Sequence, residues 1–113
     1  MNNKEMITEL ELSLDYAKKL VARGEALQRV HANRDFKEIV LEGYFKEEAI
    51  RLVMLKGDPS MQDQTSQLSI IKQIDAISAF VQYMRVVEHT ANMASKALAD
   101  GQETMAELMA EEV

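Results

Sequence analysis

Apolar residues recur at intervals of three and four along most of the chain, which is the spacing of α-helices that bury one face. The first such helix has its central seam at Leu10, Leu14, Ala17, Val21 and Gly24. Asn2 can cap the start of this helix, with Glu5 in the capping-box position, and Asn33 is a suitable stop signal. The pattern therefore predicts a helix over residues 3–32.

A second helix is predicted over residues 36–56, with Asp35 as its N-cap and Glu38 as the capping-box partner. Helical spacing is kept by Phe36, Val40, Leu41, Phe45, Ala49, Leu52 and Val53. Because so short a turn separates the first two helices, we expect them to form an antiparallel hairpin.

The clearest interruption of the helical pattern is GDPSMQDQT, residues 57–65, in which proline cannot continue a helix. A third helix is predicted over residues 66–99, and it should end at Asp100-Gly101. A short amphipathic helix over residues 104–112 completes the chain. The pattern predicts an all-α fold with three long helices, an antiparallel helical hairpin plus a long third helix, and a short C-terminal helix.

We expect residues 1–113 to form a single helical domain in which the third helix is central. Only five of its 34 residues are charged, so it should touch neighbours on several sides. Its seam consists of Ile70, Ile74, Ile77, Val81 and Met84. Its second half contains the small residues Ala91, Ala94 and Ser95, which permit close approach of another helix.

The second helix places Gly43 beside two aromatic residues, Tyr44 and Phe45, although a helical glycine costs about 1 kcal/mol relative to alanine. Gly43 can allow another helix to approach, kink the helix, or form a notch for a side chain of a partner. One apolar row contains Phe36, Val40 and Tyr44, and a second contains Leu41, Phe45, Ala49 and Leu52. Two rows favour packing on two sides, against both sister helices or against another subunit.

Residues that carry chemistry are sparse. The chain has no cysteine, and neither His31 nor His89 follows a glutamate by the three positions that a di-iron bundle requires. No nucleophile motif or glycine-rich phosphate-binding loop occurs. Carboxylate pairs such as Glu38 with Glu42 have the spacing of solvated helix charges. We therefore expect no enzyme, no cofactor, no metal site and no small-molecule substrate.

The formal net charge of the chain is −6, which disfavours nucleic acid as a partner. The charged residues are nevertheless unevenly distributed along the sequence. Residues 18–34 hold one acid, Glu25, and residues 100–113 hold acids but no base. The basic residues of the first stretch are Lys18, Lys19, Arg23, Arg29 and Arg34. The two stretches can be a solvated face and an acidic tail, complementary ends of copies that meet head to tail, or a basic strip for DNA beside an acidic end.

No apolar run approaches the roughly 20 residues of a membrane-spanning helix. The opening sequence MNNKEMITELELSLD has acidic residues where a signal peptide would have its apolar region. We therefore expect no membrane partner and a soluble protein that begins in the cytoplasm.

The segment NRDFKEIVLEGYFKEEAIRLVMLKGDPSM, followed by IDAISAFVQYMR and an acidic end, resembles small helical proteins of tailed bacteriophages. Those proteins are encoded among genes for virion structure and assembly. The resemblance covers residues 33–113 and brings no active residues with it. It implies a phage virion or assembly protein, present in the host cytoplasm during assembly and then in the virion.

These observations together favour a non-enzymatic protein that acts through helix-mediated oligomerisation or by docking on a larger phage structural protein. The residues expected to bind a partner are Phe36, Val40, Tyr44, Phe45, Lys18, Lys19, Arg23 and Arg29. One alternative is a small acidic inhibitor that occupies the basic, nucleic-acid-binding site of a host enzyme. Another is an adaptor of the DNA-packaging machinery that uses the basic strip.

Overall fold

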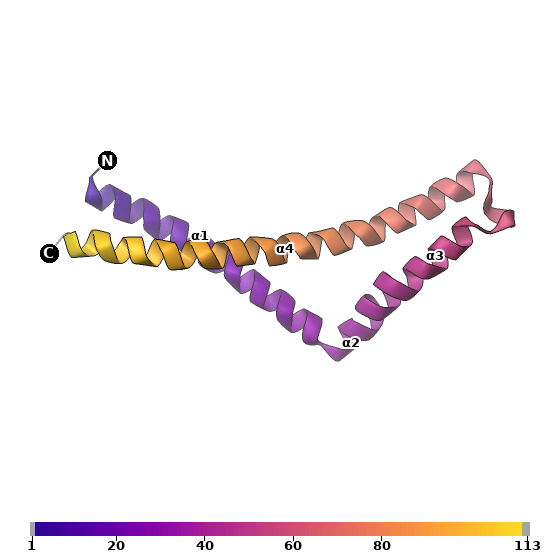
Figure 1. The fold of residues 1–113 in the computed structure, drawn as a ribbon, viewed down its shortest axis with the longest axis horizontal. Helices are drawn as coiled ribbons and strands as arrows, with labels where there is room; N and C mark the ends of the chain where they lie inside the picture. The colour runs from indigo at the N-terminus through magenta and orange to yellow at the C-terminus, as the bar shows by residue number, and fades with distance from the viewer. Residues whose placement is uncertain (1, 112–113) are drawn as a thin grey trace. The chain divides into compact units, whose positions relative to one another are not determined.

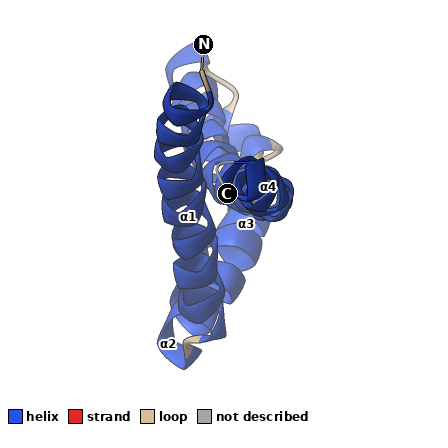
Figure 2. Ribbon diagram, turned by 90° about the vertical axis from the view of Figure 1, so that its left-hand side faces the viewer, coloured by secondary structure: helices blue, strands red, loops and turns tan. Residues whose placement is uncertain are grey.

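The computed structural model describes residues 2–111, and all of the regular structure in that part of the chain is helical (Figure 1, Figure 2). The predicted all-α class is therefore confirmed. The elements in order are α1 (Asn3–Ala32), α2 (Arg34–Phe36), the π-helix η1 (Lys37–Glu48), α3 (Ala49–Lys56), the 3₁₀-helix η2 (Pro59–Met61) and α4 (Gln64–Glu111).

The first helix has the predicted bounds and the predicted cap. The backbone N–H of Glu5 donates to Oδ1 of Asn2 at 2.8 Å. The second helical segment is capped differently, because Asn33 and not Asp35 accepts the backbone N–H of Phe36, at 2.9 Å. Asn33 has φ −68° and ψ 128°, the extended conformation that an N-cap needs, whereas Asp35 lies inside the first turn of α2. Asn33 thus ends one helix and starts the next.

The separate C-terminal helix predicted over residues 104–112 is not formed, because α4 continues without a break from Gln64 to Glu111. Residue 112 lies outside the described residues. Gly101, the predicted breaker, is helical and packs against Leu14 of α1, and a Cβ at this position would lie 2.5 Å from the Cδ2 atom of Leu14. Packing of α4 against α1 therefore outweighs the low helix propensity of this glycine.

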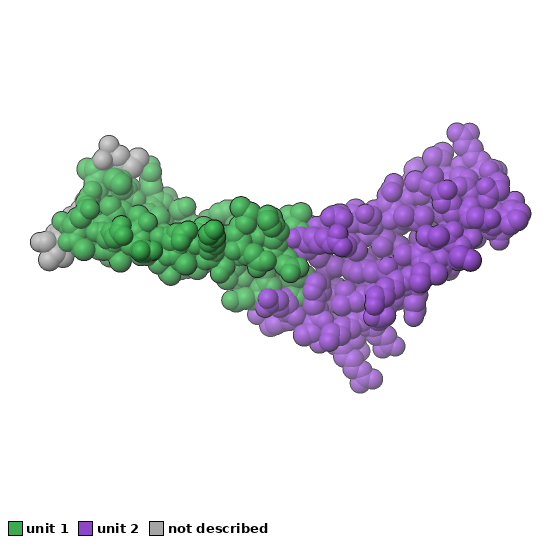
Figure 3. Space-filling view, viewed as in Figure 1, with its two compact units in different colours: residues 1–27, 86–113 green, residues 28–85 purple. Residues whose placement is uncertain are grey.

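The chain divides into two compact units (Figure 3). Unit 1 is Met1–Leu27 with Val86–Val113, and unit 2 is Gln28–Arg85. Both α1 and α4 contribute residues to both units. The single domain expected over residues 1–113 stays a prediction.

Unit 1 is an antiparallel pair formed by α1 and the C-terminal half of α4. The side-chain amide of Asn3 donates to Oε2 of Glu111 at 2.9 Å, and Gly24, near the other end of the pair, lies against Ala91. A Cβ at Gly24 would overlap the Cβ of Ala91. The close approach predicted from the small residues of the third helix is therefore present, and Gly24 is what allows it. The buried side chains of this unit belong to Ala17, Val87, Ala91, Ala94 and Leu108.

Unit 2 pairs the second helical segment with the N-terminal half of α4, also antiparallel. Its buried cluster consists of Leu52, Ile70 and Ile77. Tyr44, Phe45, Ala49, Leu55, Met61 and Ile74 pack around that cluster. The hairpin predicted between the first two helices would join residues of both units, and it stays a prediction.

The connection between α3 and α4 is held by side-chain hydrogen bonds. Nε2 of Gln67 donates to the carbonyl oxygen of Lys56 at 2.9 Å, and Nε2 of Gln62 donates to the carbonyl oxygen of Asp58 at 2.8 Å. Asp63 accepts the backbone N–H of Ser66 at 2.9 Å, next to the start of α4. These bonds satisfy backbone groups that helix ends leave without partners, and they fix the end of unit 2.

Replacement of Gly24 by alanine is expected to destabilise the protein, because the new methyl group would overlap a Cβ that no rotamer can move. In a helix without this contact the same change would add about 1 kcal/mol of stability. We expect a net loss of about 1–3 kcal/mol in the free energy of unfolding, measured with urea. Gly101→Ala is the matched control, since the end of Leu14 can rotate away, and its loss should be smaller. A Gly24→Ala protein as stable as the original would contradict the close contact.

Candidate functional site

The segment that carries the predicted aromatic anchors is a π-helix, Lys37–Glu48, which leads without interruption into α3. Sequence periodicity did not predict it. In a π-helix each N–H bonds to the carbonyl five residues earlier, so that a turn takes more residues than in an α-helix. A π-helix of 12 residues is unusual, because most consist of a single turn and many lie at functional sites.

The wider turn changes which residues share a face. Positions four and five apart now lie above one another, so the two apolar rows of this segment merge into one broad face. All of their members in and next to the π-helix are half-buried: Phe36, Val40, Leu41, Tyr44, Phe45 and Ala49. Tyr44, Phe45 and Ala49 of these rows pack against the buried cluster of unit 2, and packing of the segment on a second side stays a prediction. Ile39 also lies in the π-helix but belongs to neither row, and 69% of its surface is exposed.

Gly43 lies inside the π-helix and does not receive another helix. A Cβ at Gly43 would meet one neighbour among the described residues, the carbonyl oxygen of Glu38 at 3.2 Å. Glu38 is the residue five positions earlier, one π-helical turn away. The glycine therefore avoids a close contact between a Cβ and this carbonyl oxygen. The close helix approach that was one of the expectations for Gly43 occurs at Gly24 instead.

Tyr44 and Phe45, two of the three aromatic residues predicted to bind a partner, belong to an aromatic cluster with Phe80 of α4. The ring centroid of Phe80 lies 5.4 Å from that of Phe45 and 6.5 Å from that of Tyr44, and the rings of Tyr44 and Phe80 meet edge to face. Such pairs add about 0.5–1.5 kcal/mol to the burial of their surface. Phe80 is still 43% exposed. The cluster thus stabilises unit 2, and part of the Phe80 side chain stays exposed.

The other predicted aromatic anchor, Phe36, stacks on His31 with ring centroids 5.9 Å apart. Nε2 of His31 lies 3.3 Å from the sulfur of Met84. Val40 is half-buried on the same helical segment. The structure therefore brings Tyr44 and Phe45 together and places Phe36 in a second contact, and the role of all four residues in binding a partner stays a prediction.

The predicted basic residues are all exposed, and the unit boundary divides them. Lys18, Lys19 and Arg23 belong to unit 1, whereas Arg29 belongs to unit 2. Unit 2 holds eight Lys and Arg and eight Asp and Glu, whereas unit 1 holds five basic and eleven acidic residues. The net charge of −6 therefore comes entirely from unit 1, and unit 2 is neutral.

Large apolar side chains are exposed on both units, and such side chains are candidates for binding a partner. Among the described residues, 15 large apolar side chains are exposed, whereas nine hydrophobic residues are buried. Those of unit 1 are Met6, Leu12, Tyr16, Val86, Met93 and Met109. Those of unit 2 are Val30, Ile39, Ile50, Val53, Met54, Leu68, Ile71, Phe80 and Tyr83. Val53, which fits the apolar spacing of the second helix, is 59% exposed.

The sequence carried a signal for part of this surface. Ile50, Val53 and Met54 have the i, i+3, i+4 spacing of one helix face. Leu52 lies between them in sequence and on the opposite side of α3, where it is fully buried. The α3 segment is therefore apolar on two sides, and only one of them is covered.

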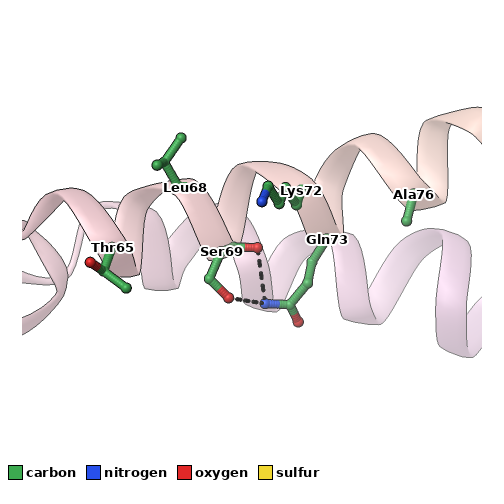
Figure 4. Close-up of a pocket in the computed structure, with 6 residues that line it drawn as sticks. All are labelled: Thr65, Leu68, Ser69, Lys72, Gln73 and Ala76. Atoms are coloured by element: carbon green, nitrogen blue, oxygen red, sulfur yellow. Dashed lines mark hydrogen bonds between the residues drawn. The ribbon is translucent and has the colours of Figure 1, made fainter.

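The outer side of α4 in unit 2 has a shallow hollow, shown in Figure 4. Its lining residues are Thr65, Leu68, Ser69, Lys72, Gln73 and Ala76. Nε2 of Gln73 donates to the carbonyl oxygen of Ser69 at 3.2 Å. Because all six residues belong to one helix, the hollow is an open part of the surface and not an enclosed cavity.

Within residues 2–111, no group of three or more His, Asp and Glu side chains is placed to hold a metal ion. The carboxylates with a shifted pKa have structural roles. The hydroxyl and backbone N–H of Ser60 donate to Oδ1 of Asp58 at 2.6 and 2.8 Å and lower the pKa of this carboxyl below 3.8. Hydrogen bonds from Ser66 lower the pKa of Asp63 in the same direction. No helix in this part of the chain is long and apolar enough to cross a membrane.

We expect Ser60→Ala to raise the pKa of Asp58, because the hydroxyl that stabilises the carboxylate is removed. Since the pKa of Asp58 is lowered by folding, its contribution to stability is complete above pH 3.8 and is lost as the pH falls through the lowered value. Carboxyl-carbon NMR titration measures this shift directly. Ser69→Ala is the control, and it should leave Asp58 unchanged. An Asp58 that titrates identically with and without the Ser60 hydroxyl would show that this bond is not formed.

Comparison of the chain with protein-family models, with curated proteins and with solved structures finds no match.

Proposed function

We propose that this chain is a non-enzymatic helical interaction protein that acts by burying its outer helix faces against copies of itself or against a larger partner. The observation that carries the proposal is the excess of exposed over buried apolar side chains, 15 against nine in the described residues. Complete burial of one Val, Leu, Ile, Phe or Met side chain contributes about 1.5–3 kcal/mol. A partner that covers several of these side chains gains part of this contribution from each, which offsets the entropic cost of association.

The size of the units supports the same proposal. Each unit is built mainly from two long helical segments, and small units bury a small fraction of the surface that their unfolded chain exposes. Contiguous apolar surface on a small protein commonly marks a site of protein interaction. We also keep, as a proposal for the assembled state, the antiparallel hairpin of the first two helices.

The resemblance of residues 33–113 to small helical phage proteins supports a particular setting. We propose that the protein takes part in virion assembly, in the host cytoplasm first and then in the virion, and that it docks on itself or on a larger structural protein. Phe80, which is 43% exposed, and Tyr83, which is 63% exposed, offer further aromatic surface to such a partner.

The acidity of unit 1 favours a second candidate. With eleven acidic and five basic residues, this unit suits the basic, nucleic-acid-binding site of a host enzyme. The chain would then be an inhibitor or adaptor and not a virion component. A DNA-packaging adaptor that uses Lys18, Lys19 and Arg23 is less favoured, because the same unit carries the excess of acids.

We expect the purified protein to have a solution mass above the 12.8 kDa of one chain, because association covers the outer helix faces. Light scattering after size exclusion measures this mass, and mass spectrometry of purified phage particles tests the location. A 12.8 kDa monomer that is missing from the particles would contradict the proposal. A pull-down from host lysate that retains one host enzyme would favour the inhibitor.

A further inference from the structure

We infer that a hollow in the acidic end of unit 1 binds the outer row of α1 from a second copy of this chain. The acidic end consists of residues 3–14 and 101–111, which lie between the hydrogen bond of Asn3 with Glu111 and the contact of Leu14 with Gly101. The outer row consists of Leu12, Tyr16, Lys19 and Arg23. The inference rests on the proposed function and names the partner and the two surfaces that meet.

The acidic end has a shallow hollow between its two helices. Its lining residues are Met6, Glu9, Leu10 and Ser13 of α1 and Thr104 and Leu108 of α4. Leu108 is buried and Leu10 is half-buried, whereas Met6 is 39% exposed. Because both helices contribute to the hollow, a third helix that lies along it contacts both of them, as in helix-in-groove recognition.

Acidic side chains border the hollow on both helices. The acidic end holds one basic residue, Lys4, and six acidic residues, Glu5, Glu9, Glu11, Glu103, Glu107 and Glu111. Glu9 is a lining residue and Lys4 is not. Glu107 follows the lining residue Thr104 by three positions, which places it on the same side of α4. Apolar side chains between carboxylates favour a partner segment that carries both large apolar and basic side chains.

The outer row of α1 is such a segment. Its four residues follow one another at intervals of four, three and four positions, so they lie within about 60° of the helix circumference. Leu12 is 67% exposed and Tyr16 is 64% exposed. Lys19 and Arg23 are exposed as well. The row therefore presents two large apolar and two basic side chains on one side of a helix.

Charge complementarity favours a second copy of the chain as the partner. Residues 12–23 hold three basic residues and one acidic residue, whereas the acidic end holds six acidic residues and one basic residue. Surfaces of opposite charge attract each other and fix the register of a complex. The outer row lies on the solvent side of α1, so it cannot reach the hollow between α1 and α4 of its own chain. The contact therefore requires two copies.

The contact joins two different surfaces of unit 1. Leu12 and Tyr16 of one copy cover the apolar part of the hollow of the next copy, and Lys19 and Arg23 lie among its carboxylates. Each copy offers one hollow and one outer row, so copies join head to tail and form a ring or a filament. A symmetric contact between two acidic ends would be opposed by repulsion.

Two double variants with reversed charges test the inference. Lys19→Glu with Arg23→Glu makes the outer row acidic, and Glu9→Lys with Glu107→Lys makes the borders of the hollow basic. Each variant alone then has like charges on the two surfaces that should meet. We expect each to raise the dissociation constant of self-association about tenfold or more, measured by sedimentation over a concentration series. All four positions are exposed, so helix content by circular dichroism should not change.

An equimolar mixture of the two variants should associate again, because the outer row of each then meets a hollow of opposite charge. Lys4→Glu with Lys18→Glu is the matched control, since it reverses two exposed basic residues of unit 1 outside the outer row and the hollow lining. It should alter the dissociation constant by no more than about threefold at 0.15 M salt.

A mixture that stays as dissociated as the separate variants overturns the inference. An oligomer that neither variant weakens, or that the control weakens equally, overturns this contact and leaves the proposed function standing. An original chain that is monomeric at all concentrations also overturns the inference, and the particle analysis then decides the proposed function.

Discussion

A pair of antiparallel helices shares one face, and every apolar residue outside that face stays in contact with water. Both units of this protein are such pairs, and this constraint explains their main features. The cores are narrow, with Leu52, Ile70, Ile77 and Met84 buried in unit 2 and mostly small residues buried in unit 1. The outer sides keep large aliphatic and aromatic side chains that a third or fourth helix would normally cover. This arrangement is the basis on which we propose that the protein acts by interaction with another chain.

The two units solve the packing problem differently. In unit 1, glycine and alanine bring the helix backbones close together, so the contact of Gly24 with Ala91 replaces large interdigitating side chains. In unit 2, the π-helix widens the turn and gathers two apolar rows onto one side, where Tyr44 and Phe45 meet Phe80. Charge is divided along the same boundary, since unit 2 is neutral and unit 1 is acidic. The neutral unit also carries nine of the 15 exposed apolar side chains.

Helical periodicity was sufficient to predict the all-α class, the bounds of α1 and the stop at Gly57, because each depends on local spacing and on proline or capping chemistry. Features set by tertiary contacts were not predictable in this way. Gly101 reads as a helix breaker, yet contact with Leu14 keeps it helical. The π-helix leaves no signature that an α-helical spacing detects. For the candidate site, the sequence pointed to the aromatic residues, whose role in binding stays a prediction, and it gave no binding role to the exposed row at Ile50, Val53 and Met54.

The central claim is that the outer helix faces are interfaces, so that folding and association are coupled. The most direct measurement is the melting temperature of the full chain at protein concentrations from about 1 to 100 μM. Binding to the folded state makes the melting temperature depend on concentration. The account predicts that it rises steadily over this range, whereas a melting temperature that is the same at every concentration would contradict it.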